Sequence, residues 1–158
     1  MASGLFCLPM EYNLEQTANF NIDFNDTTAD RFKCMLTTAS WTPNYSTHSI
    51  KSDVTNEVSG AGYTAGGESL TSITFATSGG TITWDAADVE WTSSTITSAR
   101  YAVIYDDDLT NKPLICAIDF GGDFSTTSVT FKITWNASGI FTLDLTPEEE
   151  IMAIPSSN

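Results

Sequence analysis

The chain is poor in basic residues. It holds 6 Lys and Arg against 20 Asp and Glu, which gives a formal net charge of −14 at pH 7. A field of this sign repels phosphate backbones and anionic lipid head groups. The composition therefore argues against nucleic acid and membrane surfaces as partners. It leaves a basic protein surface or a divalent cation open, and acidity of this size also keeps a protein soluble at high concentration.

Histidine and cysteine are scarce as well. His48 is the only histidine, so a Ser or Cys nucleophile would have to find its base in that one loop, and no Gly-x-Ser-x-Gly elbow accompanies it. Cys7, Cys34 and Cys116 are odd in number and lack metal-ligand spacing. They predict three free thiols in a protein made in a reducing cytoplasm. We expect no cofactor.

Long hydrophobic runs are missing too. No window approaches the length of a membrane span, and the apolar residues 5–8 are too few for a signal-peptide core. A length of 158 residues with 41% hydrophobic residues suits one packed unit. We therefore expect a single domain over residues 1–158.

What the chain does have is alternation of apolar and polar residues, the period of a strand with one buried face. Two hairpins are predicted on this basis, one around Ser78-Gly79-Gly80 and one around residues 136–139. The apolar members of the alternating runs are Phe20, Ile22, Phe24; Phe32, Cys34, Leu36; Ile73, Phe75; Ile82, Trp84; Val129, Phe131, Ile133, Trp135; Phe141, Leu143, Leu145.

Two longer runs, residues 95–105 and 113–120, are apolar on both faces, which is typical of central strands. Two helical turns are predicted, one capped by Asp85 and one opened by Thr146 with Pro147 in its first position. The expected fold is all-β, a two-sheet antiparallel β-sandwich resembling a jelly roll, with about eight strands and two short helical turns.

Catalytic and metal motifs are incomplete wherever they begin. The Gly-rich residues 59–67 lack the phosphate-binding spacing, and Asp106-Asp107-Asp108 lacks the Gly and distal Glu of an EF-hand, so we expect a solvated loop there rather than a calcium site. A hydrolase using two carboxylates stays open in so acidic a chain, but no spacing pairs them. We predict that the protein is not an enzyme and has no catalytic residues.

Tryptophans offer an alternative function. Trp84 and Trp135 are in register with core residues, whereas Trp41 and Trp91 lie on or near loops. Exposed aromatic rings on a β-sandwich can stack on sugars. A carbohydrate-binding module using Trp41 and Trp91 is therefore the alternative of a different class.

Arg100 is the most informative charge. It shares a strand face with Ile96, Ala102 and Ile104, which predicts that it is partly buried. A guanidinium in such a place needs a carboxylate partner. We expect a structural ion pair that joins a strand to a loop.

Both ends of the chain are apolar without alternation, which predicts burial against the protein itself or against a partner. An N-terminal arm, residues 1–12, and a C-terminal segment, residues 146–158, are distinguished from the sandwich. The arm is expected to be surplus to the core and free to dock on a neighbour. The candidate partner contacts are Leu5, Phe6, Leu8, Pro9, Met10, Ile151, Met152 and Ile154.

Three segments in a fixed order carry a resemblance. They are Gly62-Tyr63-Thr64-Ala65-Gly66-Gly67, residues 97–105 and residues 113–121, with Trp91 between the first two. In this order, over residues 19–145, the chain resembles small virion structural proteins of tailed bacteriophages. The resemblance implies a capsid decoration or cement protein, or a tail- or head-fibre-associated component. It further implies a homotrimer that binds the major capsid protein or another virion protein, located in the virion after synthesis in the host cytoplasm.

Overall fold

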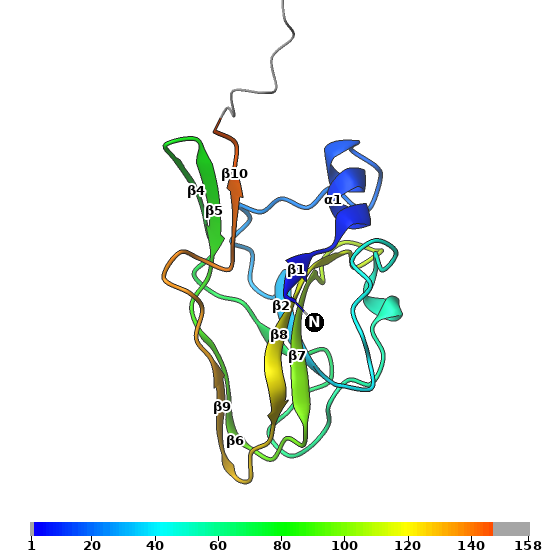
Figure 1. The fold of residues 1–158 in the computed structure, drawn as a ribbon, viewed down its shortest axis with the longest axis vertical. Helices are drawn as coiled ribbons and strands as arrows, with labels where there is room; N and C mark the ends of the chain where they lie inside the picture. The colour runs from blue at the N-terminus through cyan, green and yellow to red at the C-terminus, as the bar shows by residue number, and fades with distance from the viewer. Residues whose placement is uncertain (1, 147–158) are drawn as a thin grey trace, which may run out of the picture.

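The computed structural model describes residues 2–146, and they form two layers of antiparallel strands with one helix (Figure 1). The predicted all-β sandwich is confirmed. In chain order the elements are β1 (Gly4–Leu5), α1 (Cys7–Leu14), β2 (Phe32–Thr38), the 3-10 turn η1 (Lys51–Asp53), β3 (Glu68–Ser69), β4 (Thr74–Ser78), β5 (Thr81–Asp85), β6 (Val89–Ser94), β7 (Ala99–Asp106), β8 (Leu114–Phe124), β9 (Val129–Ile133) and β10 (Phe141–Asp144).

The first layer is a five-stranded sheet with the order β1-β8-β7-β2-β3. Its central strand β7 is buried on both faces, with Val103 and Ile104 both fully inaccessible to solvent. β8 follows β7 as a hairpin partner, in register from Ala102 opposite Ile118 to Ile104 opposite Cys116. The two runs that are apolar on both faces are thus the central strands, as predicted.

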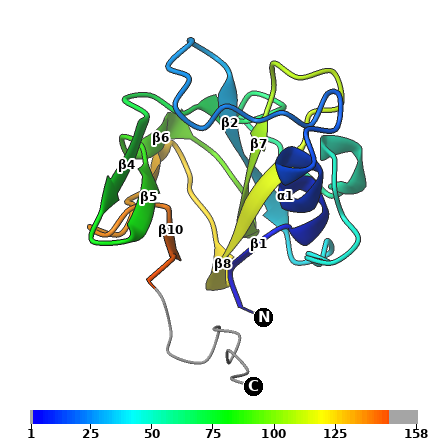
Figure 2. The ribbon, with the colours of Figure 1, turned by 90° about the horizontal axis from the view of Figure 1, so that it is seen from above.

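The second layer is narrower and consists of two short sheets. β6 pairs with β9 at one end, and β5 pairs with β4 and β10 at the other. Because β5 leads directly into β6, and β9 leads through residues 134–140 into β10, the layer is a long ribbon interrupted once on each side. Figures 1 and 2 show this ribbon on one side of the five-stranded sheet and α1 on the other.

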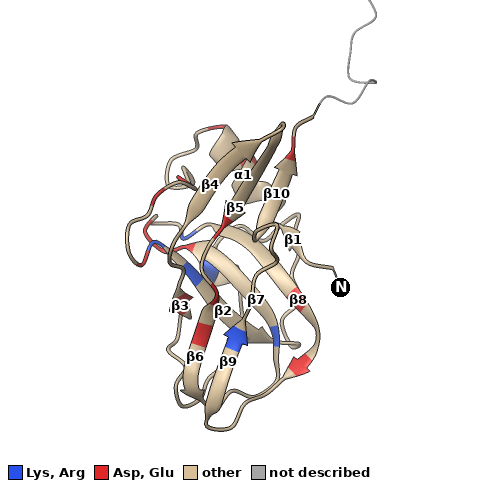
Figure 3. Ribbon diagram, turned by 90° about the vertical axis from the view of Figure 1, so that its left-hand side faces the viewer, with Lys and Arg blue, Asp and Glu red and all other residues tan. Residues whose placement is uncertain are grey.

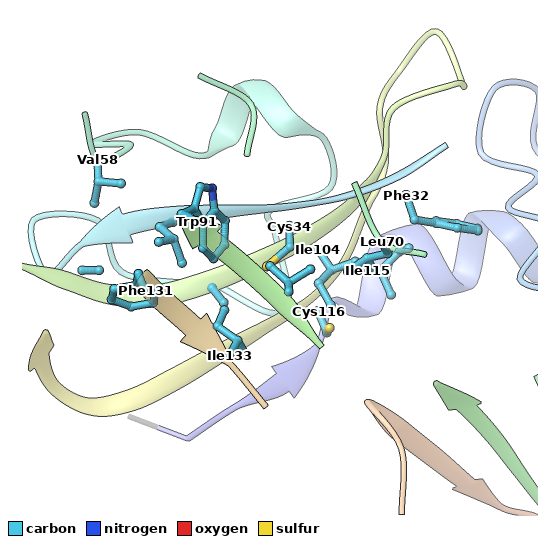
Figure 4. Packing of buried hydrophobic residues seen from close by; sticks show 14 of the residues in the cluster. Phe32, Cys34, Val58, Leu70, Trp91, Ile104, Ile115, Cys116, Phe131 and Ile133 are labelled. Carbon is cyan, nitrogen blue, oxygen red and sulfur yellow. The ribbon is translucent and has the colours of Figure 1, made fainter. Parts of the chain in front are cut away.

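The main core lies between the layers. Trp91, Phe131 and Ile133 of the ribbon pack in one cluster with Cys34, Ile104 and Cys116 of the large sheet (Figure 4). A smaller cluster covers the opposite face of the large sheet and contains Phe6, Met35, Trp41, Tyr101, Val103, Tyr105, Leu114 and Ala117. The large sheet is therefore covered on both faces, which explains why β7 is apolar throughout.

Helix α1 was not predicted. It begins after Phe6, which provides no side-chain cap, and Pro9 is tolerated because it lies in the first turn. Its apolar residues lack the spacing of one helical face, so the pattern carried no helical signal. No helix among residues 2–146 is long and apolar enough to cross a membrane.

Three predicted elements are wrong. Residues 20–24 form no strand, although Phe20 and Ile22 are buried, because no neighbouring strand pairs with them in the described structure. β9 and β10 are not a hairpin, since each pairs with a different strand. No helical turn follows Asp85, because β5 ends there and β6 begins at Val89. The turn predicted at Thr146 extends outside the described residues.

Candidate functional site

A groove of about 780 Å³ opens between the edges of the two layers. At this level the second layer has only two strands, β6 and β9, opposite a sheet in which β8 runs on past its short neighbour β1. β1 reaches only Cys116 and Ala117, so Ile118 and Phe120 of β8 lie beyond its cover. The groove is the place where the narrower layer fails to cover β8.

Aromatic rings line this groove. Phe120 contacts Phe124 edge-on and Phe131 in a tilted arrangement, with 6.0 Å between ring centroids in each case. Phe124 is 52% exposed at the rim. Trp135 is held in place because its indole Nε1 donates to the carbonyl of Ala87 at 2.9 Å. The wall is therefore rigid and apolar, with hydroxyl and amide groups from residues such as Thr130 and Asn136 between the rings.

The groove carries no acidic side chain among the described residues that line it, although the chain has 20 Asp and Glu. Its one lining charge, Lys132, lies beside Glu90 of β6, as Figure 3 shows, and its Nζ is 3.1 Å from Asp88 Oδ2. The hydrogen bond from Lys132, with a second from the Trp135 N–H, lowers the pKa of Asp88. The groove is thus close to neutral in a strongly acidic protein.

A second candidate surface, which we name the apolar end, consists of Leu14, Leu143 and Leu145. Their exposed fractions are 84%, 38% and 64%. Leu14 ends α1 and the other two belong to β10 or follow it, and Figure 1 shows α1 and the tip of β10 at the same end of the molecule. They lie on two separate elements at this end, and large apolar side chains exposed in this way can serve as contacts for a partner.

Arg100 has the carboxylate partner that its pattern required. Its Nε donates to Asp119 Oδ1 at 2.7 Å, and its Nη1 lies 3.9 Å from Asp123 Oδ1. The hydrogen bond from Arg100, helped by the N–H of Gly121, holds the pKa of Asp119 well below its ordinary value. The pair joins two neighbouring strands, β7 and β8, rather than a strand to a loop as predicted.

A buried charge cluster surrounds Arg31. Its Nε and Nη2 donate to Asp106 Oδ2 at 3.1 and 2.9 Å, and its Nη1 donates to Asp26 at 2.6 Å. Asp106 is fully buried, and its Oδ1 accepts the N–H groups of Asp108 and Leu109. Burial raises the pKa of Asp106, and these donors act against that shift. Arg31 thus anchors the loop before β2 to the end of β7.

The aspartate run is only in part the solvated loop that we expected, since the Asp108 side chain is 65% exposed. Asp106 is inaccessible, and Asp107 lies 2.5 Å from Lys112 Nζ and 3.3 Å from Lys33 Nζ. With their oxygens held by cations and backbone N–H groups, these carboxylates do not converge on an empty position. Within residues 2–146, no group of three or more His, Cys, Asp or Glu side chains is arranged to hold a metal ion.

His48 is packed against aromatic rings. Its ring stacks on Trp41 at 5.7 Å, and its Nδ1 accepts the N–H of Asn44 at 3.3 Å. The three cysteines are free, and burial raises the pKa of Cys116 to about 12 and that of Cys34 further. These two buried thiols therefore stay protonated at neutral pH.

Trp84 is fully buried, as predicted, but the other three tryptophans are arranged opposite to expectation. Trp41 and Trp91, the predicted sugar platform, are 4% and 1% exposed. Trp135, predicted to be core, is only half-buried and lines the groove. The loops around Trp41 fold over the large sheet and bury its ring, whereas Trp135 follows the last residue of β9, where the covering layer ends.

The N-terminal arm is also corrected. Phe6 is fully buried, its N–H donates to Ile115 at 3.0 Å, and Pro9 is buried in α1. Leu5 and Met10 pack on the main core, and Leu8 is half-buried. These residues belong to the fold and are not surplus. Ile151, Met152 and Ile154 lie outside the described residues.

The sequence reasoning missed the groove residues. Phe120 ends the run that we assigned to a central strand, and Phe124 follows it. Nothing in that run shows that β8 extends beyond its neighbour β1. The groove could not be predicted because the sequence does not show that β1 has only two residues and β8 eleven.

Comparison of the chain with models of protein families, with curated proteins and with solved structures finds no match.

Proposed function

We propose that the chain is a non-enzymatic structural protein of a tailed-bacteriophage particle, a capsid decoration or cement protein that binds the major capsid protein and reinforces the shell as a homotrimer. The observation that carries the proposal is the apolar end. Leu14 and Leu145 are 84% and 64% exposed on a protein whose net charge would otherwise keep it dispersed. A contact of this kind suits attachment to a larger protein surface.

The resemblance supports the same proposal, because its three segments meet in space. Residues 97–105 and 113–121 cover most of the β7–β8 hairpin. The hydroxyl of Tyr105 in β7 donates at 2.8 Å to the carbonyl of Gly66, which belongs to the remaining segment, residues 62–67. The shared motifs are therefore the centre of one architecture and not scattered coincidences.

The alternative of a carbohydrate-binding module is weakened, since Trp41 and Trp91 are buried. The other alternative, a tail- or head-fibre-associated component, would use the same apolar end and differs only in the site of attachment. The test must therefore report where on the particle the protein binds.

The test is binding to particles that lack the protein. Purified full-length chain is mixed with emptied heads and, separately, with isolated tails, and bound protein is measured after sedimentation. We expect saturable binding to heads and a higher temperature of shell rupture. The double variant Leu14→Asp/Leu145→Asp should bind at least about tenfold more weakly, which corresponds to the loss of about 1.4 kcal/mol.

The matched control is Thr92→Asp, which adds a carboxylate at an exposed position of β6, at the end of the molecule away from the tip of β10 (Figure 1), and should bind like the wild type. Binding to tails alone would move the proposal to a tail component. Binding to neither, or equal binding of the wild type and the double variant, would overturn it.

A further inference from the structure

The groove lies beside β9, at a place where the sheet of β6 and β9 could take one more strand. β9 pairs with β6 along one edge, and in the described part of the chain no strand pairs with its other edge. Such an edge leaves backbone N–H and C=O groups without sheet partners, which an added strand can bind. Since neighbouring strands lie about 4.8 Å apart, one strand added beside β9 would cover Ile118 and Phe120.

The usual protection of a free edge is weak here. Lys132 is the one charged residue of β9, and its ammonium is drawn toward Asp88 on the β6 side. Phe124, 52% exposed, lines the groove, and Val129, the first residue of β9, is 55% exposed. This edge is therefore open to pairing and offers apolar contacts to an incoming chain.

The neutral lining selects the occupant. A groove without carboxylates, in a chain of net charge −14, is the place where an uncharged and partly apolar peptide is accepted best. The chain itself contains such a peptide: residues 151–158, Ile-Met-Ala-Ile-Pro-Ser-Ser-Asn, carry no charged side chain. Their first four residues are apolar, as strand addition to an aromatic groove requires.

The direction of β10 favours donation between copies. Ile140, just before β10, lines the groove, and the strand runs from there to the β4–β5 turn, where the N–H of Leu145 donates to Gly80 at 2.9 Å. The described chain thus leaves at the far end of β10. Residues 151–158 therefore start from the end of β10 that is farther from their own groove, which favours the groove of a neighbouring copy.

From these observations we infer that residues 151–158 of one copy bind in the groove of a second copy and add a strand to the free edge of β9. Each copy gives one segment and accepts one, which is a head-to-tail contact that closes into a ring. The inference rests on the proposed association of copies, and it assigns the surface that joins them. It leaves the apolar end free for the shell.

The decisive experiment is photo-crosslinking of the full-length chain. p-Benzoylphenylalanine replaces Met152, ¹⁵N-labelled and unlabelled protein are mixed before irradiation, and crosslinked peptides are identified by mass spectrometry. We expect crosslinks from position 152 to residues 118–136 that join labelled to unlabelled chains. The same probe at Leu14, on α1, is the control and should give no crosslinks to this region.

Crosslinks found only within one isotopic form would show that the groove is closed by its own chain, and would overturn the inference. Absence of any crosslink from position 152 to the groove would overturn it as well. Because this readout does not involve particles, its failure is distinct from a failure of shell binding.

A pair of full-length variants gives a second readout. Phe124→Asp places a carboxylate in the groove, and Thr92→Asp adds one at an exposed position of β6 that belongs neither to the groove lining nor to the apolar end. We expect Phe124→Asp to weaken self-association at least tenfold in sedimentation equilibrium and Thr92→Asp to leave it unchanged. Thr130→Asp, at an exposed residue that also lines the groove, replaces Phe124→Asp if circular dichroism shows the latter to be unfolded. Equal association of the groove variant and the Thr92 variant would contradict the inference.

Discussion

Arg100 on β7 reaches Asp119 on β8, the residue opposite its neighbour Tyr101, with the guanidinium Nε 2.7 Å from the carboxylate Oδ1. The Arg100 side chain is 24% exposed and the Asp119 side chain 3%. The backbone N–H of Asp119 also donates to the hydroxyl of Ser3 at 3.0 Å. The pair therefore ties the outer half of β8 both to the sheet centre and to the start of the chain.

Arg100→Ala is expected to lower the midpoint of thermal unfolding, because it removes the guanidinium that donates to the nearly inaccessible Asp119 side chain. Lys132→Ala is the control, since it breaks an ion pair whose lysine is 48% exposed and exposed pairs contribute little. A midpoint for Arg100→Ala no lower than that of Lys132→Ala would show that the Arg100 pair is not structural.

Stability should fall in acid. The pKa of Asp119 is lowered in the folded protein by the Arg100 hydrogen bond, and the pKa values of Asp26 and Asp107 are lowered too. In the unfolded chain an aspartate titrates near about 3.9. A group whose folded pKa is depressed stabilises the fold above the unfolded pKa, and this contribution disappears as the pH falls toward the folded pKa.

Urea unfolding should therefore give a nearly constant contribution from these groups between about pH 7 and about pH 5, and a loss below about pH 4. Asp119→Asn removes one of the groups and should reduce the slope of stability against pH in the acid range. An unchanged slope in that variant would mean that Asp119 does not contribute to the acid sensitivity.

Phe6→Ala should destabilise the fold by about 3–5 kcal/mol, because the ring is fully buried and packs on Tyr45 at 5.2 Å. Leu14→Ala, in the same N-terminal region but 84% exposed, should change stability by less than about 0.5 kcal/mol. Denaturant unfolding of both variants makes the comparison. Equal, small effects would restore the idea of a free N-terminal arm.

Gly67→Ala should be far more harmful than Gly79→Ala. Both glycines have positive φ, +82° and +57°, but a Cβ on Gly67 would lie 1.9 Å from the carbonyl oxygen of Cys34, and one on Gly79 would meet nothing within 4 Å. We expect about 1 kcal/mol for Gly79→Ala and at least about 3 kcal/mol for Gly67→Ala. Similar unfolding free energies for the two variants would contradict this placement of the Gly-rich loop on β2.

The strands that could be predicted from the sequence are those in which the pattern of apolar side chains matches the faces that the fold buries. Phe32, Cys34 and Leu36 alternate because β2 has one face on the main core, and β7 is apolar throughout because it is covered on both sides. The Gly79-Gly80 turn was found because the two residues between paired Ser78 and Thr81 both need positive φ.

Pairing over long distances could not be predicted in the same way. The run from Val129 to Ile133 alternates equally well whichever strand lies beside it, and its partner β6 is some forty residues earlier. Phe20 and Ile22 alternate because each rests on the core, yet no strand pairs with them in the described structure, and burial alone does not make a strand. The groove results from the pairing of β9 with β6 and of β8 with the short β1, so no local pattern of residues revealed it.

The pairing of β1 with β8 has a consequence for synthesis. Gly4 pairs with Ala117, so β1 leaves the ribosome 113 residues (117 − 4) before its partner. Until then Phe6 has no carbonyl of Ile115 to bind and remains open to solvent or to chaperones. The β7–β8 hairpin can form from neighbouring residues, whereas closure of the sheet at β1 must wait. Of the described strands of this sheet, the one made earliest is thus paired late.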